Sequence, residues 1–328
     1  MSLPKCRIAD IRQDSGGSSL FWRRKIVEEA LKKAQVLTEA LPYIKEFKNK
    51  IVVIKLGGSA QDDPAILKSI FIDCQILLAV GIRPVVVYGG GKKISHAMKD
   101  TGRSVRFIHG QRVTDAQTME IVARVLSDDV GGELLGLLRE SGGQGFLLNG
   151  RDHAFLRAIK KSLPEFPDAD LGFVGEPVAI DSTPVHHAFE ADRWPDARER
   201  IPLIAPVACG CGRDSAHLYN VNGDTAASLI ARDLHAEKLV FISDISGIYR
   251  DKDDPKSIFS HLDREEVTSL VREGIIAGGM IPKVEACLYA LEGGVKKAHI
   301  VAGSLPHALL LEIFTKSGIG TEIVLERL

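Results

Sequence analysis

The chain has 328 residues, of which 45% are hydrophobic and 26% charged, with 31 glycines and 14 prolines. This composition is typical of a soluble globular protein and excludes collagen, low-complexity and wholly disordered chains. At roughly 100 to 200 residues per domain, the length predicts two lobes, each able to bury its own core.

The charges nearly cancel, because 42 Lys plus Arg face 43 Asp plus Glu for a formal net charge of -1. A chain without a summed positive field is not expected to bind nucleic acid or an anionic membrane. No apolar run approaches the ~18 residues of a spanning helix, and the first residues lack a signal-peptide core, which predicts a cytoplasmic location. The scattered cysteines predict reduced structural thiols and no protein metal site.

The first periodic pattern lies at residues 20–47, after a polar start that predicts a mobile tail. Apolar residues three or four apart predict an amphipathic helix, namely Val27, Leu31, Ala34, Leu37 and Leu41. Pro42 lies inside this helix and lacks an N–H, so a kink or break is expected there. A helix of ~20 residues reaches ~30 Å, and periodicity alone leaves open whether it crosses to a neighbouring subunit or packs on its own.

After residue 50, short β-branched runs alternate with longer amphipathic segments. The runs predicted as buried strands are 51–56, 83–88, 146–149, 202–207, 239–243 and 298–301. The segments predicted as helices are 64–80, 92–101, 114–140, 224–234, 262–273, 282–291 and 306–315, with Thr114 and Gln117 as a capping box for the third. This alternation predicts a mostly parallel sheet covered on both faces. The interval 151–200 breaks the rhythm and predicts hairpins and loops beside the first lobe.

Two glycine-rich turns follow buried strands, where ligands gather in such a sheet. Lys55 precedes the turn at residues 57–59, whose amides can bind an anion, although a tight turn with a lysine at a sheet end explains the same residues. Residues 89–91 are three glycines before a helix, and because a simple turn needs only one or two, they favour close approach of a ligand. Neither run matches the P-loop or the dinucleotide fingerprint, and the protein-kinase signatures are missing.

Two later segments place charged side chains at helix starts. Asn220, Asn222 and Asp224 precede an Ala-rich helix, and Asp224 alone could be no more than a helix cap. Lys283 falls in the first turn of a helix that Pro282 starts. Because the helix dipole disfavours a cation there, Lys283 suggests a nearby anion.

Together the motifs resemble the amino acid kinase family, and within it the members that phosphorylate N-acetyl-L-glutamate. The resemblance covers residues 36–324 through EALPYIKEF, VVIKLGGSA, YGGGKKIS, GQRVTD, DLGFVGE, YNVNGDTAA, SDISGIY, GIIAGGMIPKVEACLYALEGGV and PHALLLEIFTKSGIGTEI. It implies an α/β fold: a three-layer α/β/α sandwich with an open, mostly parallel central sheet, plus an N-terminal helix. The implied divisions are a tail and kinked oligomerisation helix (1–47), an N-lobe for the acyl amino acid and dimerisation (48–236) and an ATP-binding C-lobe (237–328).

The implied activity is ATP-dependent phosphorylation of the side-chain carboxylate of N-acetyl-L-glutamate, in arginine biosynthesis. That acceptor is already ionised at pH 7, so no general base is needed, and cations must bring two anions together. Mg²⁺ is expected to be held mainly by nucleotide phosphates and water rather than by a protein metal site. The acyl phosphate hydrolyses easily, so the lobes are expected to close around it.

The resemblance also implies roles for individual residues. Lys55 and Lys283 match lysines that stabilise the transferring phosphoryl group, and Asp224 matches the carboxylate that holds both. Arg112 matches the residue that grips the substrate α-carboxylate, and Asn220 the asparagine that contacts the acetylated amino acid. Backbone donors match Gly57, Gly58, Gly90 and Gly91, and nucleotide-contacting segments match Asp244, Ile245, Ser246, Gly247, Ile248, Tyr249, Ile275, Ile276 and Ala277.

Several positions depart from the commonest family pattern. Tyr88 stands where His usually precedes the glycines, His109 where Asn is common, and Gly223 where Ala is usual, and the stretch 180–200 is longer. These differences keep open a sister kinase whose acceptor is an aminoadipate-type compound, carbamate or a nucleoside monophosphate.

A rival of another class is a catalytically silent sensor of arginine or nucleotide. Retention of Lys55, Asp224 and Lys283 together argues against it, because a pure sensor would not need all three. Family members with both the N-terminal helix and the C-terminal PHALLLEIFTKSGIGT string tend to be arginine-inhibited hexamers built from dimers. The resemblance therefore implies a homo-oligomer and an arginine effector near the C-terminal string.

Overall fold

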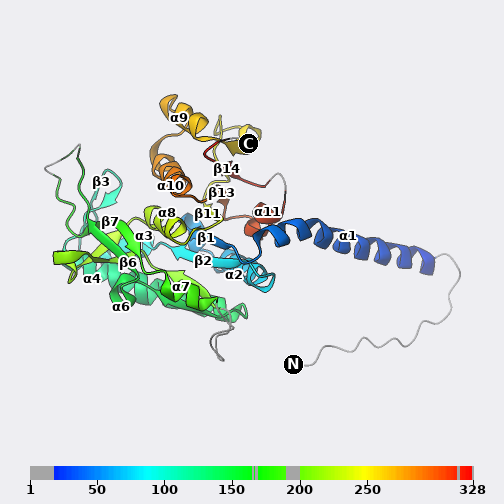
Figure 1. The fold of residues 1–328 in the computed structure, drawn as a ribbon, viewed down its shortest axis with the longest axis horizontal. Coiled ribbons are helices and arrows are strands. Elements are labelled where there is room, and N and C mark those ends of the chain that lie inside the picture. The colour runs from blue at the N-terminus through cyan, green and yellow to red at the C-terminus, as the bar shows by residue number, and fades with distance from the viewer. Residues whose placement is uncertain (1–17, 165, 167–168, 190–199, 316–317, 327–328) are drawn as a thin grey trace. The chain divides into compact units, whose positions relative to one another are not determined.

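The computed structural model describes residues 18–164, 166, 169–189, 200–315 and 318–326 (Figure 1). The predicted mobile tail lies outside the described residues. The chain divides into two compact units, residues 1–42 and 43–328. Among the described helices, none is both long and apolar enough to cross a membrane.

Helix α1 (Ser18–Phe47) contains Pro42 in its interior without interruption. Of the expected kink or break, the break is therefore wrong. A proline in a helix removes one hydrogen bond, which would have joined its N–H to the carbonyl of Thr38. Thr38 and Pro42 are both exposed. Water can therefore satisfy that carbonyl, and the surrounding Ala, Leu, Glu and Lys residues favour continuing the helix.

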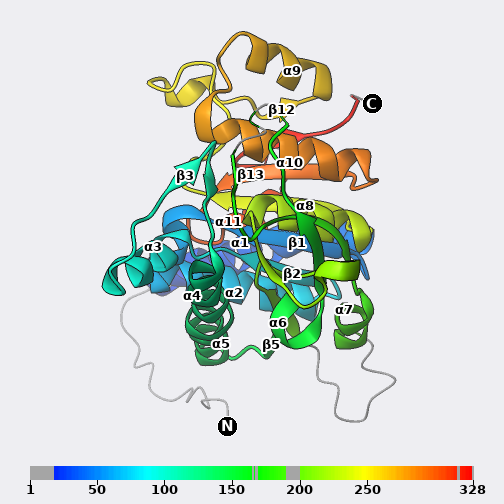
Figure 2. The same cartoon turned by 90° about the vertical axis from the view of Figure 1, so that its left-hand side faces the viewer.

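One eight-stranded sheet runs through the unit 43–328 in the order β12-β14-β13-β11-β1-β2-β8-β5 (Figures 1 and 2). Its strands are β1 (Ile51–Leu56), β2 (Arg83–Tyr88), β5 (Gly145–Leu148), β8 (Ile201–Ile204), β11 (Lys238–Ser243), β12 (His261–Leu262), β13 (Lys297–Ala302) and β14 (Thr321–Ile323). The pairings are parallel except for β13 with β14. The predicted open, mostly parallel sheet is confirmed.

Alternate residues of β1 enter two different hydrophobic cores. Val53 packs in a core with α8 (Gly223–Asp233), α9 (Arg264–Arg272) and α10 (Ile281–Glu292). Val52 and Ile54 pack in the other core, with α2 (Pro64–Ala79), α5 (Gly131–Glu140) and α11 (Ala308–Phe314). Because successive strand side chains point to opposite faces, these two cores make a three-layer α/β/α sandwich.

The helix predicted over 114–140 consists of α4 (Ala116–Arg124), a π-helical turn at Val125–Val130, and α5. The predicted Thr114 cap is wrong, because Asp115 caps α4 by accepting a hydrogen bond from the amide of Thr118 at 2.7 Å. Thr114 instead bridges to Gly172, and its hydroxyl donates to the carbonyl of Arg112. A long-range contact thus holds Thr114 outside the helix.

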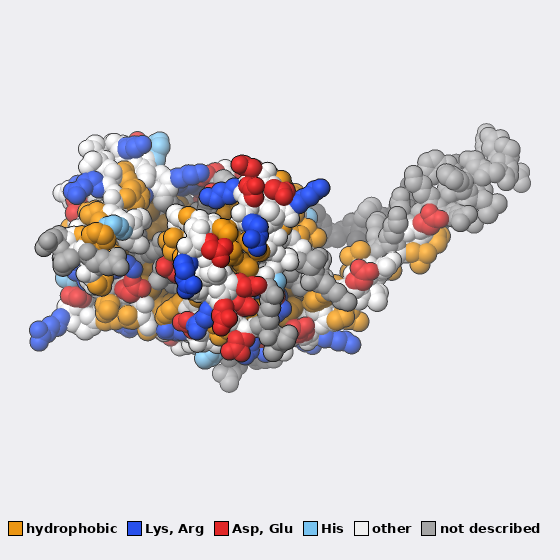
Figure 3. Space-filling model, turned by 90° about the horizontal axis from the view of Figure 1, so that it is seen from above, with side chains coloured by type: hydrophobic (Ala, Val, Ile, Leu, Met, Phe, Trp, Pro, Cys, Tyr) orange, Lys and Arg blue, Asp and Glu red, His pale blue; other side chains and the backbone are white. Residues whose placement is uncertain are grey.

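A small closed barrel lies beside the sheet and contains β6 (Leu156–Lys160), β7 (Val174–Ile180), β9 (Val207–Gly210) and β10 (Leu218–Val221). The predicted strand 202–207 is in fact two strands, β8 and β9, which belong to the sheet and the barrel respectively. The remaining short elements are the hairpin β3 (Phe107–Ile108) and β4 (Gln111–Arg112), helices α3 (Gly91–Asp100), α6 (Gly150–His153) and α7 (Thr183–Ala188), and 3-10 turns at Gly58–Gln61, Gly212–Asp214, Pro255–Ser257 and Gly278–Met280. Figure 3 shows acidic and basic side chains interspersed over one face, as expected from the balanced charge.

Candidate active site

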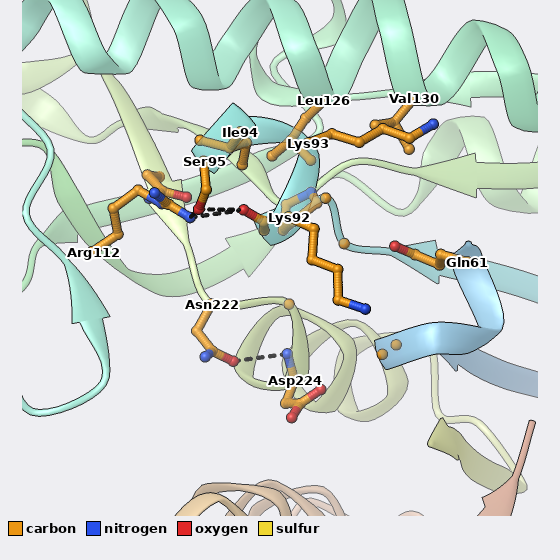
Figure 4. Close-up of a pocket in the computed structure, with 18 of the residues that line it drawn as sticks. Gln61, Lys92, Lys93, Ile94, Ser95, Arg112, Leu126, Val130, Asn222 and Asp224 are labelled. Atoms are coloured by element: carbon orange, nitrogen blue, oxygen red, sulfur yellow. Dashed lines mark hydrogen bonds between the residues drawn. The ribbon is translucent and has the colours of Figure 1, made fainter. Parts of the chain in front are cut away.

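A cavity of about 510 Å³ lies at the carboxyl ends of β1 and β2 (Figure 4). Parallel pairing brings the glycine turns that follow these two strands to the same edge of the sheet. The walls include residues singled out from the sequence, namely Lys55, Gly57, Gly58, Gly90, Gly91, Arg112, Asn220 and Asp224. The fold therefore gathers these distant motifs around one space.

Asp224 joins two lysines that are far apart in the sequence. The Lys55 ammonium lies 2.7 Å from one oxygen of the Asp224 carboxylate, and the Lys283 ammonium lies 3.0 Å from the other. Asp224 is not the cap of α8, because Asn222 accepts the hydrogen bonds from the amides of Asp224 and Thr225. The carboxylate of Asp224 is thus available to both lysines.

Burial and charge oppose each other within this cluster. Burial lowers the pKa of Lys55, and the neighbouring Lys283 acts in the same direction, although Asp224 partly offsets both. Burial disfavours ionisation of Asp224, but the two ammonium groups outweigh this effect and lower the pKa of its carboxyl. The cluster consequently holds one carboxylate between two cations in a largely desolvated place.

Neighbouring side chains lie close to the backbone at Gly57 and Gly58, so a Cβ at either position would collide with them. A Cβ at Gly57 would lie 2.5 Å from the Lys55 ammonium nitrogen, so a side chain there would displace the lysine. Gly58 has a φ of 60°, and a Cβ there would collide with the carboxylate of Asp244. The turn therefore places Asp244, which follows β11, beside the backbone that follows β1.

Arg112 lies in the wall of the cavity, and Figure 4 shows it beside Ser95. Its guanidinium donates to the carbonyl of Gly91 and the hydroxyl of Ser95, both at 2.9 Å, and lies 4.8 Å from the ring of its cross-strand partner Phe107. Burial lowers the pKa of Arg112. No carboxylate pairs with it within the part of the chain that the structure describes.

Asn220 lies in the cavity wall. Its side-chain amide nitrogen donates a hydrogen bond to the Thr114 hydroxyl at 3.2 Å, which orients the side chain. Thr114 in turn donates to the carbonyl of Arg112. Arg112 and Asn220, the two side chains that the resemblance implies as substrate contacts, are thus linked through one buried hydroxyl.

Two further lysines line the cavity mouth and were not singled out from the sequence. Lys92 pairs with Asp62 at 2.5 Å, and Lys93 pairs with Glu133. Both lysines directly follow the glycine run, and this position could have predicted that they lie near the cavity. The apolar wall residues Leu126 and Val130 had no such signal, because they lie within a long helical pattern.

The segments predicted to contact nucleotide lie outside the walls of this cavity. Ile248 and Ile276 are buried in a hydrophobic core, and the amide of Ile248 donates to the Thr321 hydroxyl at 2.8 Å. Asp244, Ile245 and Ala277 are exposed. The carbonyl of Ile248 also accepts a hydrogen bond from the amide of Phe259 at 2.8 Å, and the side chains of Ile248 and Ile276 have almost no exposed surface for a ligand.

The fit of a divalent cation can be judged from the donors. Among the described residues, no group of three or more His, Cys, Asp or Glu side chains could hold a metal ion. Asp224 already balances two ammonium groups. This donor set suits a cation that arrives with phosphate oxygens and water as its main ligands.

A model of the amino acid kinase family matches residues 50–302. This chain belongs to that family. Two relatives of this amino acid kinase are the acetylglutamate kinases of Heliobacterium modesticaldum, 44% identical over 90% of this chain and 99% of that protein, and of Methanothrix thermoacetophila, 45% identical over 89% and 99%.

Solved structures share the fold of this chain. N-acetylglutamate synthase from Neisseria gonorrhoeae, complexed with coenzyme A and N-acetyl-glutamate, superposes with a TM-score of 0.75 and 25% identity. That match covers 90% of this amino acid kinase but only 64% of the synthase chain, which is less than two thirds of its length. Carbamate kinase from Giardia lamblia has a TM-score of 0.60 at 16% identity and shows the shared fold alone.

Proposed function

We propose that this amino acid kinase transfers the γ-phosphoryl group of ATP to the side-chain carboxylate of N-acetyl-L-glutamate. The observation that carries the proposal is the pair of ammonium groups, Lys55 and Lys283, held on the two oxygens of Asp224 beside the cavity. Relatives named acetylglutamate kinase, 42–45% identical to this chain over about 90% of its length, support the choice of acceptor.

The reaction brings together two anions that repel each other. The transferring phosphoryl group carries negative charge on its equatorial oxygens in the transition state, and preorganised cations stabilise that charge. Lys55 and Lys283 would supply this stabilisation, and Asp224 would fix their positions. No side chain needs to remove a proton, because a carboxylate with an ordinary pKa near 4.3 is ionised at neutral pH.

Arg112 and Asn220 would hold the acceptor at the other end of the cavity. The buried guanidinium has no carboxylate partner among the described residues, so binding the α-carboxylate would compensate its desolvation. The amides of Gly90 and Gly91 would donate to the acceptor or to the phosphoryl group. Gly90 and Gly91 both line the cavity, which supports this role for their backbone.

The C-lobe, residues 237–328, would bind ATP through the segments 244–249 and 275–277, and the N-lobe, residues 48–236, would bind the acceptor and dimerise. Asp244 beside Gly58 supports this arrangement, because it joins the end of β11 to the turn after β1. Mg²⁺ would partly neutralise the phosphates when bound. Closure of the lobes would protect the acyl phosphate from water.

We also propose a homo-oligomer, a dimer that assembles further into a hexamer, located in the cytoplasm and inhibited by arginine. Exposed apolar side chains along α1, namely Val27, Leu31, Val36, Leu37 and Leu41, support an intersubunit role for this helix. Arginine would bind near the C-terminal string. That string contains Glu312, whose carboxylate accepts hydrogen bonds from the amides of Ile319 and Gly320.

The test is ADP release by the purified chain with Mg²⁺-ATP and a panel of acceptors. N-acetyl-L-glutamate should give the highest kcat/KM, ahead of N-acetyl-L-aminoadipate, carbamate and nucleoside monophosphates. Adding arginine should lower the rate. A higher kcat/KM for another acceptor would replace the proposed substrate, and no turnover with any acceptor would favour a silent sensor.

A further inference from the structure

Tyr88 is the last residue of β2 and directly precedes the glycine turn of the cavity. Its side chain is fully buried, and its hydroxyl donates to the carbonyl of Leu126 at 3.0 Å, 38 residues farther along the chain. Leu126 belongs to the π-helical turn Val125–Val130. The end of β2 is therefore tied to an irregular turn between α4 and α5.

The same carbonyl of Leu126 also accepts a hydrogen bond from the amide of Gly131, across the π-helical turn. A Cβ at Gly131 would lie 2.6 Å from the Tyr88 hydroxyl oxygen, so the phenol and a side chain at Gly131 cannot share this space. Gly131 has a φ of -59°, which any residue adopts in a helix. Its lack of a side chain here makes room for the tyrosine hydroxyl.

The π-helical turn also forms part of the cavity wall. Leu126 and Val130 line the cavity, and a Cβ at Gly90 would lie 2.7 Å from the Leu126 side chain and 3.3 Å from that of Val130. Tyr88 and Gly90 thus both contact the π-helical turn, Tyr88 through a hydrogen bond and Gly90 through close packing. Figure 4 shows Leu126 and Val130 together above the cavity. π-turns inside α-helices occur frequently at functional sites.

We propose that Tyr88 is a positioning residue for the acceptor half of the site. Its hydrogen bond to Leu126 fixes the π-helical turn against Gly90, and so sets where the apolar wall and the Gly90–Gly91 backbone lie relative to Arg112. This inference rests on the proposed kinase function, because it assigns the acceptor to the end of the cavity that Arg112 occupies. Burial, together with the nearby Asp128, raises the pKa of the Tyr88 phenol, which keeps the donor proton in place.

The first test is Tyr88→Phe in the full chain, because this change removes only the hydroxyl. Loss of one buried hydrogen bond should raise the KM of the acceptor about 3- to 10-fold while the KM of ATP stays within about 2-fold. Tyr289→Phe is the matched control, because Tyr289 is exposed on α10 and its hydroxyl contacts Arg232 away from the cavity. The control should leave both KM values unchanged.

The second test is a double-mutant cycle with Gly131→Ala. Alone, Gly131→Ala should raise the acceptor KM more than Tyr88→Phe does, because its methyl group must displace the hydroxyl. Combined with Tyr88→Phe, the methyl group fills the space that the hydroxyl leaves, so the double variant should have a lower acceptor KM and a higher Tm than Gly131→Ala alone.

Both tests use the acceptor that the wild-type chain phosphorylates best. If that acceptor is not N-acetyl-L-glutamate, the proposed function changes, but the role of Tyr88 can still be tested. A selective rise in acceptor KM with recovery in the double variant supports the positioning role. A lowered Tm with both KM values unchanged, or an equal rise in both, would overturn it and leave Tyr88 with a structural role only.

Discussion

The ammonium of Lys55 lies 2.7 Å from the carboxylate of Asp224, which joins the end of β1 to the first turn of α8. Side chains at residues 51 and 53 of β1 enter the core shared with α8, and Lys55 lies on the same face two residues later. The strand thus aims the lysine at the start of the helix. This pairing holds the Lys55 ammonium at the cavity wall.

Lys283→Ala should lower kcat by about 100- to 1,000-fold, the effect typical of deleting one preorganised charge-stabilising donor. Steady-state ADP release at saturating substrates measures this loss. Lys68→Ala is the control, because Lys68 forms an exposed pair with Glu140 at 2.9 Å and should tolerate the change. Near-normal turnover of Lys283→Ala would remove Lys283 from the phosphoryl site.

Asp224→Asn should lower both activity and stability. It leaves two mostly buried ammonium groups without their shared counter-charge, and breaking such a buried arrangement costs about 3–5 kcal/mol. Denaturant unfolding measures the cost, and added inorganic phosphate should restore more stability to this variant than to the wild type. Asp170→Asn, at an exposed pair with Lys160, should have little effect. Equal unfolding free energies of wild type and Asp224→Asn would contradict the shared-carboxylate role.

The pH profile of kcat should have an alkaline limb that reports Lys55. The active form of Lys55 is the protonated amine. Because burial lowers its pKa from the ordinary value of 10.5, the midpoint of the fall in activity should lie below pH 10.5. Lys55→Arg keeps its charge at these pH values and should shift the limb upward, although at a lower kcat. An alkaline limb that stays in place in Lys55→Arg would assign it to another group.

The free energy of unfolding should decrease at acidic pH, because the Asp224 carboxylate becomes protonated. Because the pKa of this carboxyl is lower in the folded chain than its ordinary value of 3.8, the stabilisation is complete above that value and is lost as the pH falls through the folded pKa. Thermal unfolding followed from pH 6 downward measures it. The Asp224→Asn variant should show a shallower decline, and parallel curves would refute the assignment.

Arg112→Lys should mainly raise the KM of the acceptor, by about 10- to 100-fold, because an ammonium cannot reproduce the two parallel hydrogen bonds of a guanidinium. kcat should change much less. Arg124→Lys serves as the control, because Arg124 forms an exposed pair with Asp129. An unchanged acceptor KM in Arg112→Lys would place the α-carboxylate elsewhere.

A chain beginning at Tyr43 should form dimers, whereas the full chain should form hexamers, if α1 joins the dimers. This start retains Phe47, which is buried and lies 4.9 Å from the Lys238 ammonium nitrogen. Light scattering after gel filtration measures the mass. Leu31→Ser with Leu37→Ser, two exposed positions on α1, should weaken the hexamer without removing the helix. Intact hexamers from the shortened chain would exclude this role.

Elements with strong local signals could be predicted from the amino-acid sequence. Runs of three or four consecutive Val and Ile residues shortly before glycine turns predict β1 and β2 to the residue. Pro282 with the following amphipathic pattern predicts the start of α10 to within one residue. Local propensity also places Lys283 in a first helical turn, where its cation is unfavourable, and this was the correct sign of a nearby anion.

Which of these residues come together depends on long-range contacts in the folded chain. Lys283 and Asp224 are 59 residues apart in the sequence. They lie in the first turns of α10 and α8, which lead into the neighbouring parallel strands β13 and β11, so both helix starts lie at the carboxyl edge of the sheet. The π-helical turn, the displaced cap at Thr114 and the division of 202–207 into two strands also depend on distant partners such as Tyr88 and Gly172. Sequence patterns report propensities over a few residues, whereas these features are set by contacts that form only when the chain has folded.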